Sequence, residues 1–277
     1  MARASGVPRV ETVRVTTTQL DHREPGVFTV EETDALVEFF ERYGYATLRD
    51  VYSEPELRAL EADLEMQQRR LVAGELPERH GTAILDDPDA QVDGRPFAHY
   101  VCHVTECSVA TEAAVHHAAV VTVVARLLGS GAWLLDDDRF GVVYQDARPG
   151  EGSGYSRIGW HSDRQSGPHL SIWPSVAFTI HIDSTSPANG FLRVVPGSHR
   201  LDPEALPPTF EKIRGEVAVY AERGDVLFHH SDLWHGAARA TADGPLGIRR
   251  HVRGGWYGGE RLAPGHGVDD FVKNAAR

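Results

Sequence analysis

The segment Gly159-Trp-His-Ser-Asp163 contains residue types from which proteins build metal sites. Side chains alternate between the two faces of a strand, so His161 and Asp163 would share one face while Ser162 points away. A third ligand must come from elsewhere, and His235 in Asp232-Leu-Trp-His-Gly236 is the candidate. Two histidines and one carboxylate on one face form the triad of non-haem Fe(II) sites, which leaves the opposite face open for other ligands.

The other histidines compete with this set, because the chain has 15 of them. They include two adjacent pairs, at 116–117 and 229–230. Neighbours on a strand point to opposite faces and neighbours on a helix diverge, so neither pair can easily chelate one ion. We interpret these four as surface or core histidines, although His230 rivals His235 for the third position. His199 is expected to fix a turn, and His181 to be a structural histidine that shares a face with Thr179.

Other motifs are incomplete. The run Asp136-Asp-Asp138 lacks the spacing and glycine of a calcium loop. Glycines 150, 152 and 154 are not followed by the Lys and Ser or Thr of a phosphate loop, and we interpret their segment as a flap. No Gly-x-Ser-x-Gly elbow is present.

Composition narrows the class of partner. The net charge is −12, which disfavours binding to phosphate backbones and anionic lipids, so we expect neither a nucleic-acid nor a membrane partner. Two cysteines and no targeting pattern favour a reduced cytoplasmic location. A small-molecule substrate fits best, and the oligomeric state is unknown.

The periodicity changes along the chain. Capping-box patterns at Thr29 and Ser53 predict two helices flanking a strand at Tyr45 to Val51, and a third helix is predicted from Ala110 to Leu128. Short strands follow at 140–144, 175–182, 191–195, 216–220, 226–228 and 248–257. The pattern predicts a mainly β protein with flanking helices. We expect one domain over 1–277, with a helical part over about 29–130 and a jelly-roll core over about 133–260.

Four further motifs follow the first pair in a specific order: Asn189 to His199, Gly224-Asp-Val-Leu-Phe228, His235-Gly-Ala-Ala and Ile248-Arg-Arg250. In this order the chain resembles the phytanoyl-CoA dioxygenase-like family over about Phe140 to Tyr257. The resemblance implies a double-stranded β-helix, related to jelly rolls and cupins, and a dioxygenase that uses Fe(II), 2-oxoglutarate and O2.

Matching the family's motifs residue by residue gives His161, Asp163 and His235 as iron ligands. Only His235, not His230, is followed by the Gly-Ala of the family's ligand. Arg249 matches the residue that holds the distal carboxylate of 2-oxoglutarate, a task suited to a guanidinium fork. It lies 14 residues after His235, a little more than the family pattern leads us to expect, so Arg253 stays an alternative. Gln145 and Thr179 are weaker matches to co-substrate contacts, and Arg250 should face the other way.

The implied reaction decarboxylates 2-oxoglutarate to succinate and abstracts hydrogen from the substrate. Hydroxylation is the default outcome, while desaturation, cyclisation and epimerisation stay open. A carboxylate at position 163 disfavours halogenation, which requires a small residue there. A cupin-like isomerase or lyase that works without oxygen is the alternative, but it has no evident use for Arg249. A non-catalytic jelly-roll binding module would need neither the triad nor a buried arginine.

The substrate is the least constrained part of the prediction. The resemblance to tailoring oxygenases and the absence of a lysine-rich patch for acyl-CoA phosphates favour a secondary metabolite, such as a polyketide or its glycoside, in antibiotic biosynthesis. Candidate substrate contacts are Tyr155, Arg157, Trp173 and Trp234.

Overall fold

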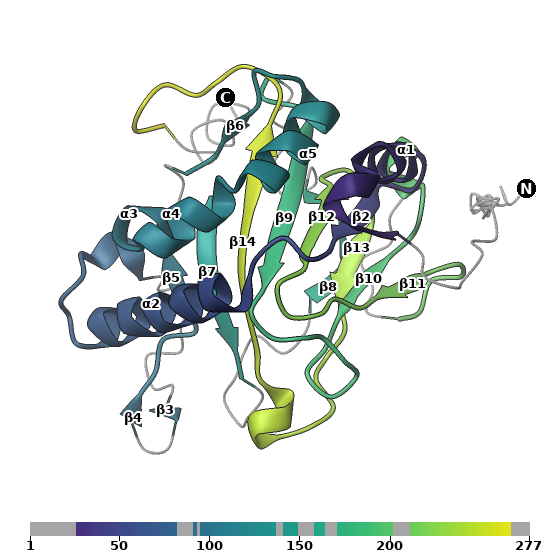
Figure 1. Cartoon of the computed structure of the whole chain (residues 1–277). Helices are drawn as coiled ribbons and strands as arrows, with labels where there is room; N and C mark the ends of the chain where they lie inside the picture. The colour runs from purple at the N-terminus through teal and green to yellow at the C-terminus, as the bar shows by residue number, and fades with distance from the viewer. Residues whose placement is uncertain are drawn as a thin grey trace, which may run out of the picture.

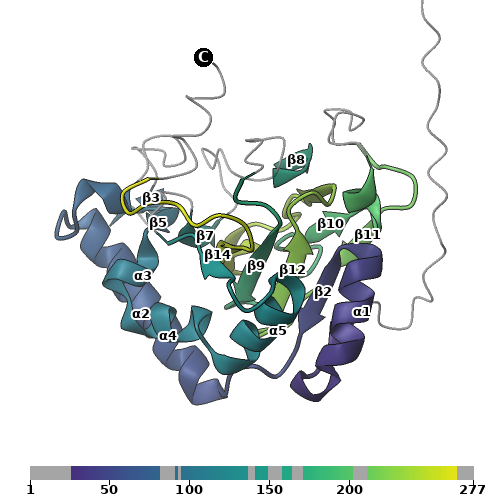
Figure 2. The same cartoon turned by 90° about the horizontal axis from the view of Figure 1, so that it is seen from above.

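The computed structural model describes residues 26–81, 91–92, 95–136, 141–148, 158–163, 171–201 and 211–266. Its helices cover one face of a large sheet, and a smaller sheet lies against the other face (Figures 1 and 2). This is the mainly β jelly-roll arrangement with flanking helices that the strand spacing predicts.

The large sheet has eight strands. Their order is β1 (Val27–Phe28), β2 (Tyr45–Leu48), β12 (Val226–His230), β9 (Ser175–His181), β14 (Arg249–Tyr257), β7 (Val142–Ala147) and β5 (Tyr100–Cys102), and β6 (Trp133–Leu134) also pairs with β14. All pairs are antiparallel except that of β1 with β2. The long strand β14 lies between β7 and β9, so its side chains occupy the middle of both sheet faces.

The small sheet has four strands in the order β11 (Val217–Val219), β10 (Leu192–Val194), β13 (His235–Ala237) and β8 (Ile158–His161). A separate hairpin joins β3 (Gln91–Val92) to β4 (Arg95–Pro96). The small sheet meets the large one through a cluster that includes Tyr45, Leu227, Val194 and Val219. The two sheets therefore enclose an interior in which β8 is an edge strand.

Residue alternation gives the two faces of the large sheet different chemistry. Phe178, Ile180, Phe228 and Val252 belong to one apolar core together with residues of the helices. Full burial of such a side chain contributes about 1.5–3 kcal/mol, so this face anchors the fold. On the opposite face, which is turned towards the small sheet, the side chains of β7, β9 and β14 are largely polar. They are Gln145, Thr179, His181, Arg249, His251 and Arg253. The fold keeps its apolar core and its polar interior on opposite sides of one sheet.

The helices are α1 (Thr33–Tyr43), α2 (Glu54–Val72), α3 (Val104–Cys107), α4 (Val109–Val115) and α5 (Ala118–Leu128). Both predicted capping boxes form: Glu32 accepts from the Thr29 N–H at 2.9 Å, and Glu56 accepts from the Ser53 N–H at 2.8 Å. The single helix predicted over Ala110–Leu128 is wrong. It is broken at His116–His117, where the His117 side chain accepts from the Ala119 N–H and begins α5.

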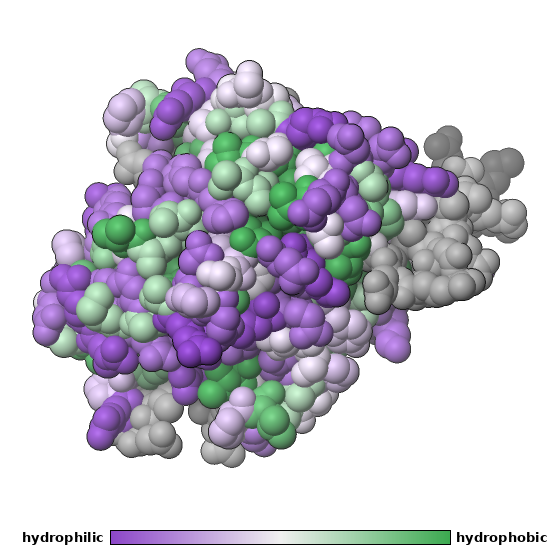
Figure 3. Space-filling view, in the orientation of Figure 1, coloured by the Kyte–Doolittle hydropathy of each residue, from purple (hydrophilic) through white to green (hydrophobic). Residues whose placement is uncertain are grey.

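The surface over the helices is mixed, with polar residues interspersed among apolar ones (Figure 3). Large exposed apolar side chains in the described residues are scattered, which is ordinary for a globular surface. No single described helix is long and apolar enough to cross a membrane; α4 and α5 pass that test only as a pair, bent by 45°. The single-domain organisation over 1–277 stays a prediction, because 1–25 and 267–277 lie outside the described residues.

Candidate metal and co-substrate site

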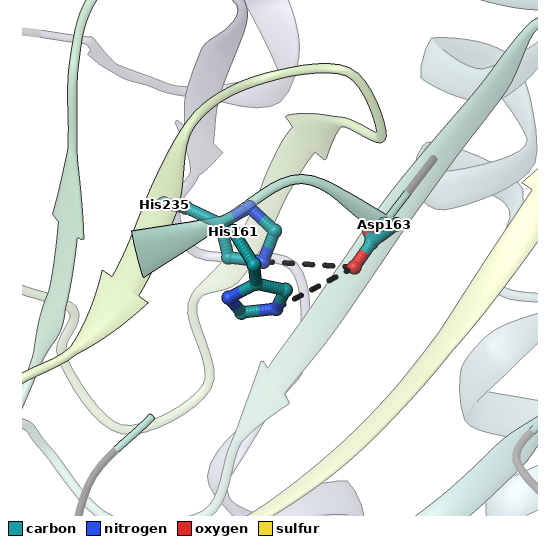
Figure 4. A group of neighbouring side chains, drawn as sticks. All are labelled: His161, Asp163 and His235. Atoms are coloured by element: carbon teal, nitrogen blue, oxygen red, sulfur yellow. Dashed lines mark ion pairs between the residues drawn. The ribbon is translucent and has the colours of Figure 1, made fainter. Parts of the chain in front are cut away.

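Three side chains meet at one end of the small sheet. His161 ends β8, His235 begins β13, and the two are paired in the antiparallel register. Asp163 follows β8, where its N–H donates to the Ser231 carbonyl at 2.8 Å. His161 Nε2 and His235 Nε2 lie 3.9 and 3.6 Å from Asp163 Oδ1 (Figure 4). One ligand atom from each residue falls within a 4.8 Å cluster, so the three can share one ion.

The histidine rings are oriented by the backbone. His161 Nδ1 lies 2.8 Å from the Gly159 carbonyl, and His235 Nδ1 lies 2.8 Å from the Leu233 carbonyl. A carbonyl can only accept, so each Nδ1 carries the proton and each Nε2 presents its lone pair. Hydrogen bonds of this kind fix the tautomer and orientation of metal-binding histidines. The donor set, with two Nε2 atoms and one carboxylate, fits a non-haem Fe(II) ion.

Burial and neighbouring charges put these ligands in the protonation states that metals require. The pKa of His235 is lowered to about 3, mainly by burial and next by the nearby His229, while Asp163 opposes this shift. Burial also opposes ionisation of Asp163, but His235, His229 and His161 outweigh it and hold its pKa well below the ordinary value. At neutral pH the site therefore offers a neutral imidazole at His235 and a carboxylate at Asp163, and neither must lose a proton to bind a metal.

The polar inner face of the large sheet supplies a second set of groups. His251 lies opposite both His181 and Gln145, and Arg253 lies opposite Thr179. The pKa of His181 is lowered to about 3, first by burial and then by the charge of Arg249; the same two causes hold the pKa of His251 well below its ordinary value. The histidines are thus neutral, and the positive charge at this end of the face comes from the two arginines.

The register places the arginines at different depths. Ala177 of β9 pairs with His229 of β12 on one side and with Gly255 of β14 on the other. His229 adjoins the triad, so Gly255 marks the position on β14 that is level with the proposed metal. Arg253 is two residues from Gly255 along β14, and Arg249 is six. At about 3.3 Å per residue, these are backbone offsets of about 7 and 20 Å. The Arg249 side chain reaches towards the small sheet: its Nη1 is 3.1 Å from the point where a Cβ on Gly190 would lie, next to the Ala238 carbonyl. Both arginines therefore stay candidates for the co-substrate.

The structure separates other sequence candidates from the triad. Trp234 packs with Trp160 and Val195, because it precedes His235 and alternation turns it to the opposite face of the small sheet. The predicted substrate role of Trp234 stays a prediction. The Trp173 indole N–H donates to Asp232 at 3.0 Å, and its ring packs on Tyr257. Tyr155 and Arg157 lie outside the described residues, as do Asp137, Asp138 and the glycines of the predicted flap.

The two histidines of the 229–230 pair have different environments. His230 faces α1, where its ring lies 6.4 Å from Phe40, and its Nδ1 accepts from the Asp232 N–H. It is therefore placed away from the ligand set. His229 is buried on the inner face, with Nε2 3.4 Å from Asp163 Oδ2. Sequence reasoning missed this contact; the alternation of β12 predicts that one of the pair faces inward, but not which.

Comparisons with known proteins identify the family of the chain and solved structures that share its fold. The family model described as phytanoyl-CoA dioxygenase (PhyH) matches residues 40–250. The epimerase SnoN from nogalamycin biosynthesis has 20% identity and a TM-score of 0.60, covering 82% of this chain and 81% of SnoN. The carbocyclase SnoK from nogalamycin biosynthesis has 21% identity and a TM-score of 0.60, covering 87% and 95%. AviO1 from Streptomyces viridochromogenes Tue57 has 23% identity and a TM-score of 0.58, covering 84% and 96%. No curated protein matches the chain in sequence.

Proposed function

Because this chain belongs to the phytanoyl-CoA dioxygenase family, whose members depend on Fe(II), 2-oxoglutarate and O2, we propose that His161, Asp163 and His235 hold its iron. The observation that carries the proposal is the convergence of these three ligand atoms within 4.8 Å, with both Nε2 lone pairs unprotonated. When bound, the iron supplies the activation of O2 that drives hydrogen abstraction from the substrate.

We propose that Arg249 holds the distal carboxylate of 2-oxoglutarate; Arg253, which the register places nearer to the metal end of β14, is the alternative. The Arg249 guanidinium can donate two parallel charge-assisted hydrogen bonds to a carboxylate. Gln145 and Thr179, on the strands that flank β14, are assigned weaker contacts to the same molecule. The charge of Arg249 lowers the pKa of both His181 and His251, so the arginine lies beside two buried neutral histidines on the inner face. The alternative, a cupin-like isomerase or lyase that works without oxygen, gives Arg249 no task.

The substrate we propose is a small organic secondary metabolite, such as a polyketide or its glycoside. Support comes from the similarity to SnoN and SnoK, both described as enzymes of nogalamycin biosynthesis. Hydroxylation is the proposed outcome, and the epimerase and carbocyclase activities of those two proteins make epimerisation and cyclisation the alternatives to test. Neither cysteine forms a disulfide, and a cytoplasmic location stays a prediction.

An anaerobic titration of apo-protein with Fe(II) and 2-oxoglutarate tests the cofactor assignment without a known substrate. The chelated complex should give a weak visible charge-transfer band, since the band requires both an open triad and a bound 2-oxo acid. Asp163→Ala should abolish the band. Bound iron with no band in the wild-type protein would overturn the 2-oxoglutarate assignment and favour the metalloenzyme that works without oxygen.

A product assay then addresses the substrate. Succinate formation and O2 uptake should rise above the uncoupled background with one member of a panel of polyketide aglycones and glycosides. Mass spectrometry of that compound would show a gain of 16 Da for hydroxylation, a loss of 2 Da for oxidative cyclisation, or no change for epimerisation. A panel without any stimulation would count against this substrate class.

A further inference from the structure

The buried imidazole of His229 lies beside the proposed metal ligands. It is 7% exposed, and its ring centroid is 4.3 Å from that of His235. Nε2 lies 3.4 Å from Asp163 Oδ2, within ion-pair distance, and neither ring nitrogen makes a hydrogen bond with a described residue. A buried polar group is normally hydrogen-bonded, so a histidine in this position requires an explanation.

The two oxygens of Asp163 face different groups. Oδ1 is the oxygen near His161 and His235, at 3.9 and 3.6 Å, whereas Oδ2 is the one near His229. The ligand cluster contains His161, Asp163 and His235 but not His229. Of the three histidines that pair with Asp163 in the described part of the chain, His229 is the one whose recorded contact is with Oδ2. The carboxylate is thus divided between the metal site through one oxygen and His229 through the other.

We infer that His229 is a positioning residue that holds Asp163 to the metal through a single oxygen. Its Nε2–H donates to Oδ2, which leaves Oδ1 as the ligand. This inference rests on the proposed function, because it assigns His229 a task at that iron. Outer hydrogen bonds of this kind orient metal ligands and are worth about 10–100-fold in metal affinity or activity.

Single-oxygen binding matters because of the number of coordination positions. His161, Asp163 and His235 would supply three ligands, and a chelating 2-oxo acid would supply two more. A second oxygen from Asp163 would compete with O2 for the metal. By holding Oδ2, His229 would prevent that competition.

The experiment compares three variants of the full chain. His229→Phe keeps a buried ring but removes the donor, and His229→Gln restores an N–H donor. The control His230→Phe alters the neighbouring residue, whose ring faces α1. Thermal unfolding of each apo-variant establishes that it folds. Fe(II) affinity is then measured anaerobically by competition with a chelator, and pulsed EPR of the Fe(II)–nitric oxide complex counts the bound imidazoles.

We expect His229→Phe to bind Fe(II) about 10–100-fold more weakly, and His229→Gln and His230→Phe to stay within about threefold of wild type. Two bound imidazoles are expected in wild type and in His229→Phe. Unchanged affinity in a folded His229→Phe would overturn the inference, and so would three imidazoles in wild type, since His229 would then be a ligand. A wild-type protein that lacks the charge-transfer band would contradict the proposed function itself, whatever the variants show.

Discussion

Two arginines of β14, Arg250 and Arg253, lie in opposite environments. On the outer face, Arg250 donates to both oxygens of Asp183 at 2.8–2.9 Å and pairs with Glu61 and Glu65 at 2.6 and 2.8 Å. On the inner face, Arg253 makes no ion pair or hydrogen bond with any described residue. An arginine surrounded by carboxylates stabilises the fold, whereas one whose charge is left unmatched attracts a carboxylate from solution. Because side chains alternate along β14, its outer-face arginine can stabilise the fold while its inner-face arginines remain placed to bind a ligand.

The strongest test of this comparison is on the inner face. Arg249→Ala should weaken 2-oxoglutarate binding about 100–10,000-fold, because two charge-assisted hydrogen bonds are worth about 1.5–3 kcal/mol each. The charge-transfer titration measures this loss, and denaturant unfolding measures any accompanying change in stability. Arg253→Ala is the matched variant. A larger loss in Arg253→Ala than in Arg249→Ala would transfer the distal carboxylate to Arg253.

The outer face should respond in the opposite way. Arg250→Met leaves Asp183, Glu61 and Glu65 close together without their shared cation, so the free energy of unfolding should fall by about 3 kcal/mol. Affinity for 2-oxoglutarate per folded molecule should be unchanged. Chemical denaturation measures the first quantity and the anaerobic titration the second. An Arg250→Met protein of normal stability but impaired 2-oxoglutarate binding would break the division between the faces.

Gly190 tests how closely the two sheets approach near Arg249. Its φ is +88°, and an added Cβ would lie 2.5 Å from the Ala238 carbonyl and 3.1 Å from Arg249 Nη1. Gly190→Ala should therefore lower the free energy of unfolding by about 2–3 kcal/mol and weaken 2-oxoglutarate binding. Gly244 also has a positive φ but no atom within 4 Å of its added Cβ, so Gly244→Ala measures the backbone effect alone. Equal losses in the two variants would argue against a crowded contact at Gly190.

The smallest expected effect is a pH dependence from the inner-face histidines. The pKa of His181 is about 3 in the folded protein, and that of His251 is also well below the ordinary 6.5. Between these values the unfolded chain binds protons that the folded chain does not, so stability should fall as pH falls below 6.5. At pH 5 each histidine accounts for up to about 2 kcal/mol. Denaturant unfolding at pH 7 and pH 5 should show a shallower dependence in His181→Asn; an unchanged slope would contradict the buried neutral state.

The sequence predicted correctly which way a side chain points where the alternation of a strand determines it. Alternation predicts that Arg249 and Arg250 face opposite ways, and the contacts of Arg250 confirm its outward orientation. The break at His116–His117 was not predictable from propensity, since that stretch contains neither Pro nor Gly and the break depends on a cap formed by His117. His229 was missed because its approach to Asp163 depends on the packing of two sheets, which local pattern does not encode.

Because β8 is an edge strand, metal binding is linked to how firmly β8 is held against β13. Within the described residues β8 pairs only with β13, and Asp163 is tied to the turn after β12 by its N–H bond to Ser231. An ion held by His161, Asp163 and His235 would join this edge strand to its neighbour through three additional bonds. Iron occupancy and strand docking would then be one thermodynamic equilibrium. The rate of amide hydrogen exchange in β8 should therefore fall as the fraction of protein with bound metal rises.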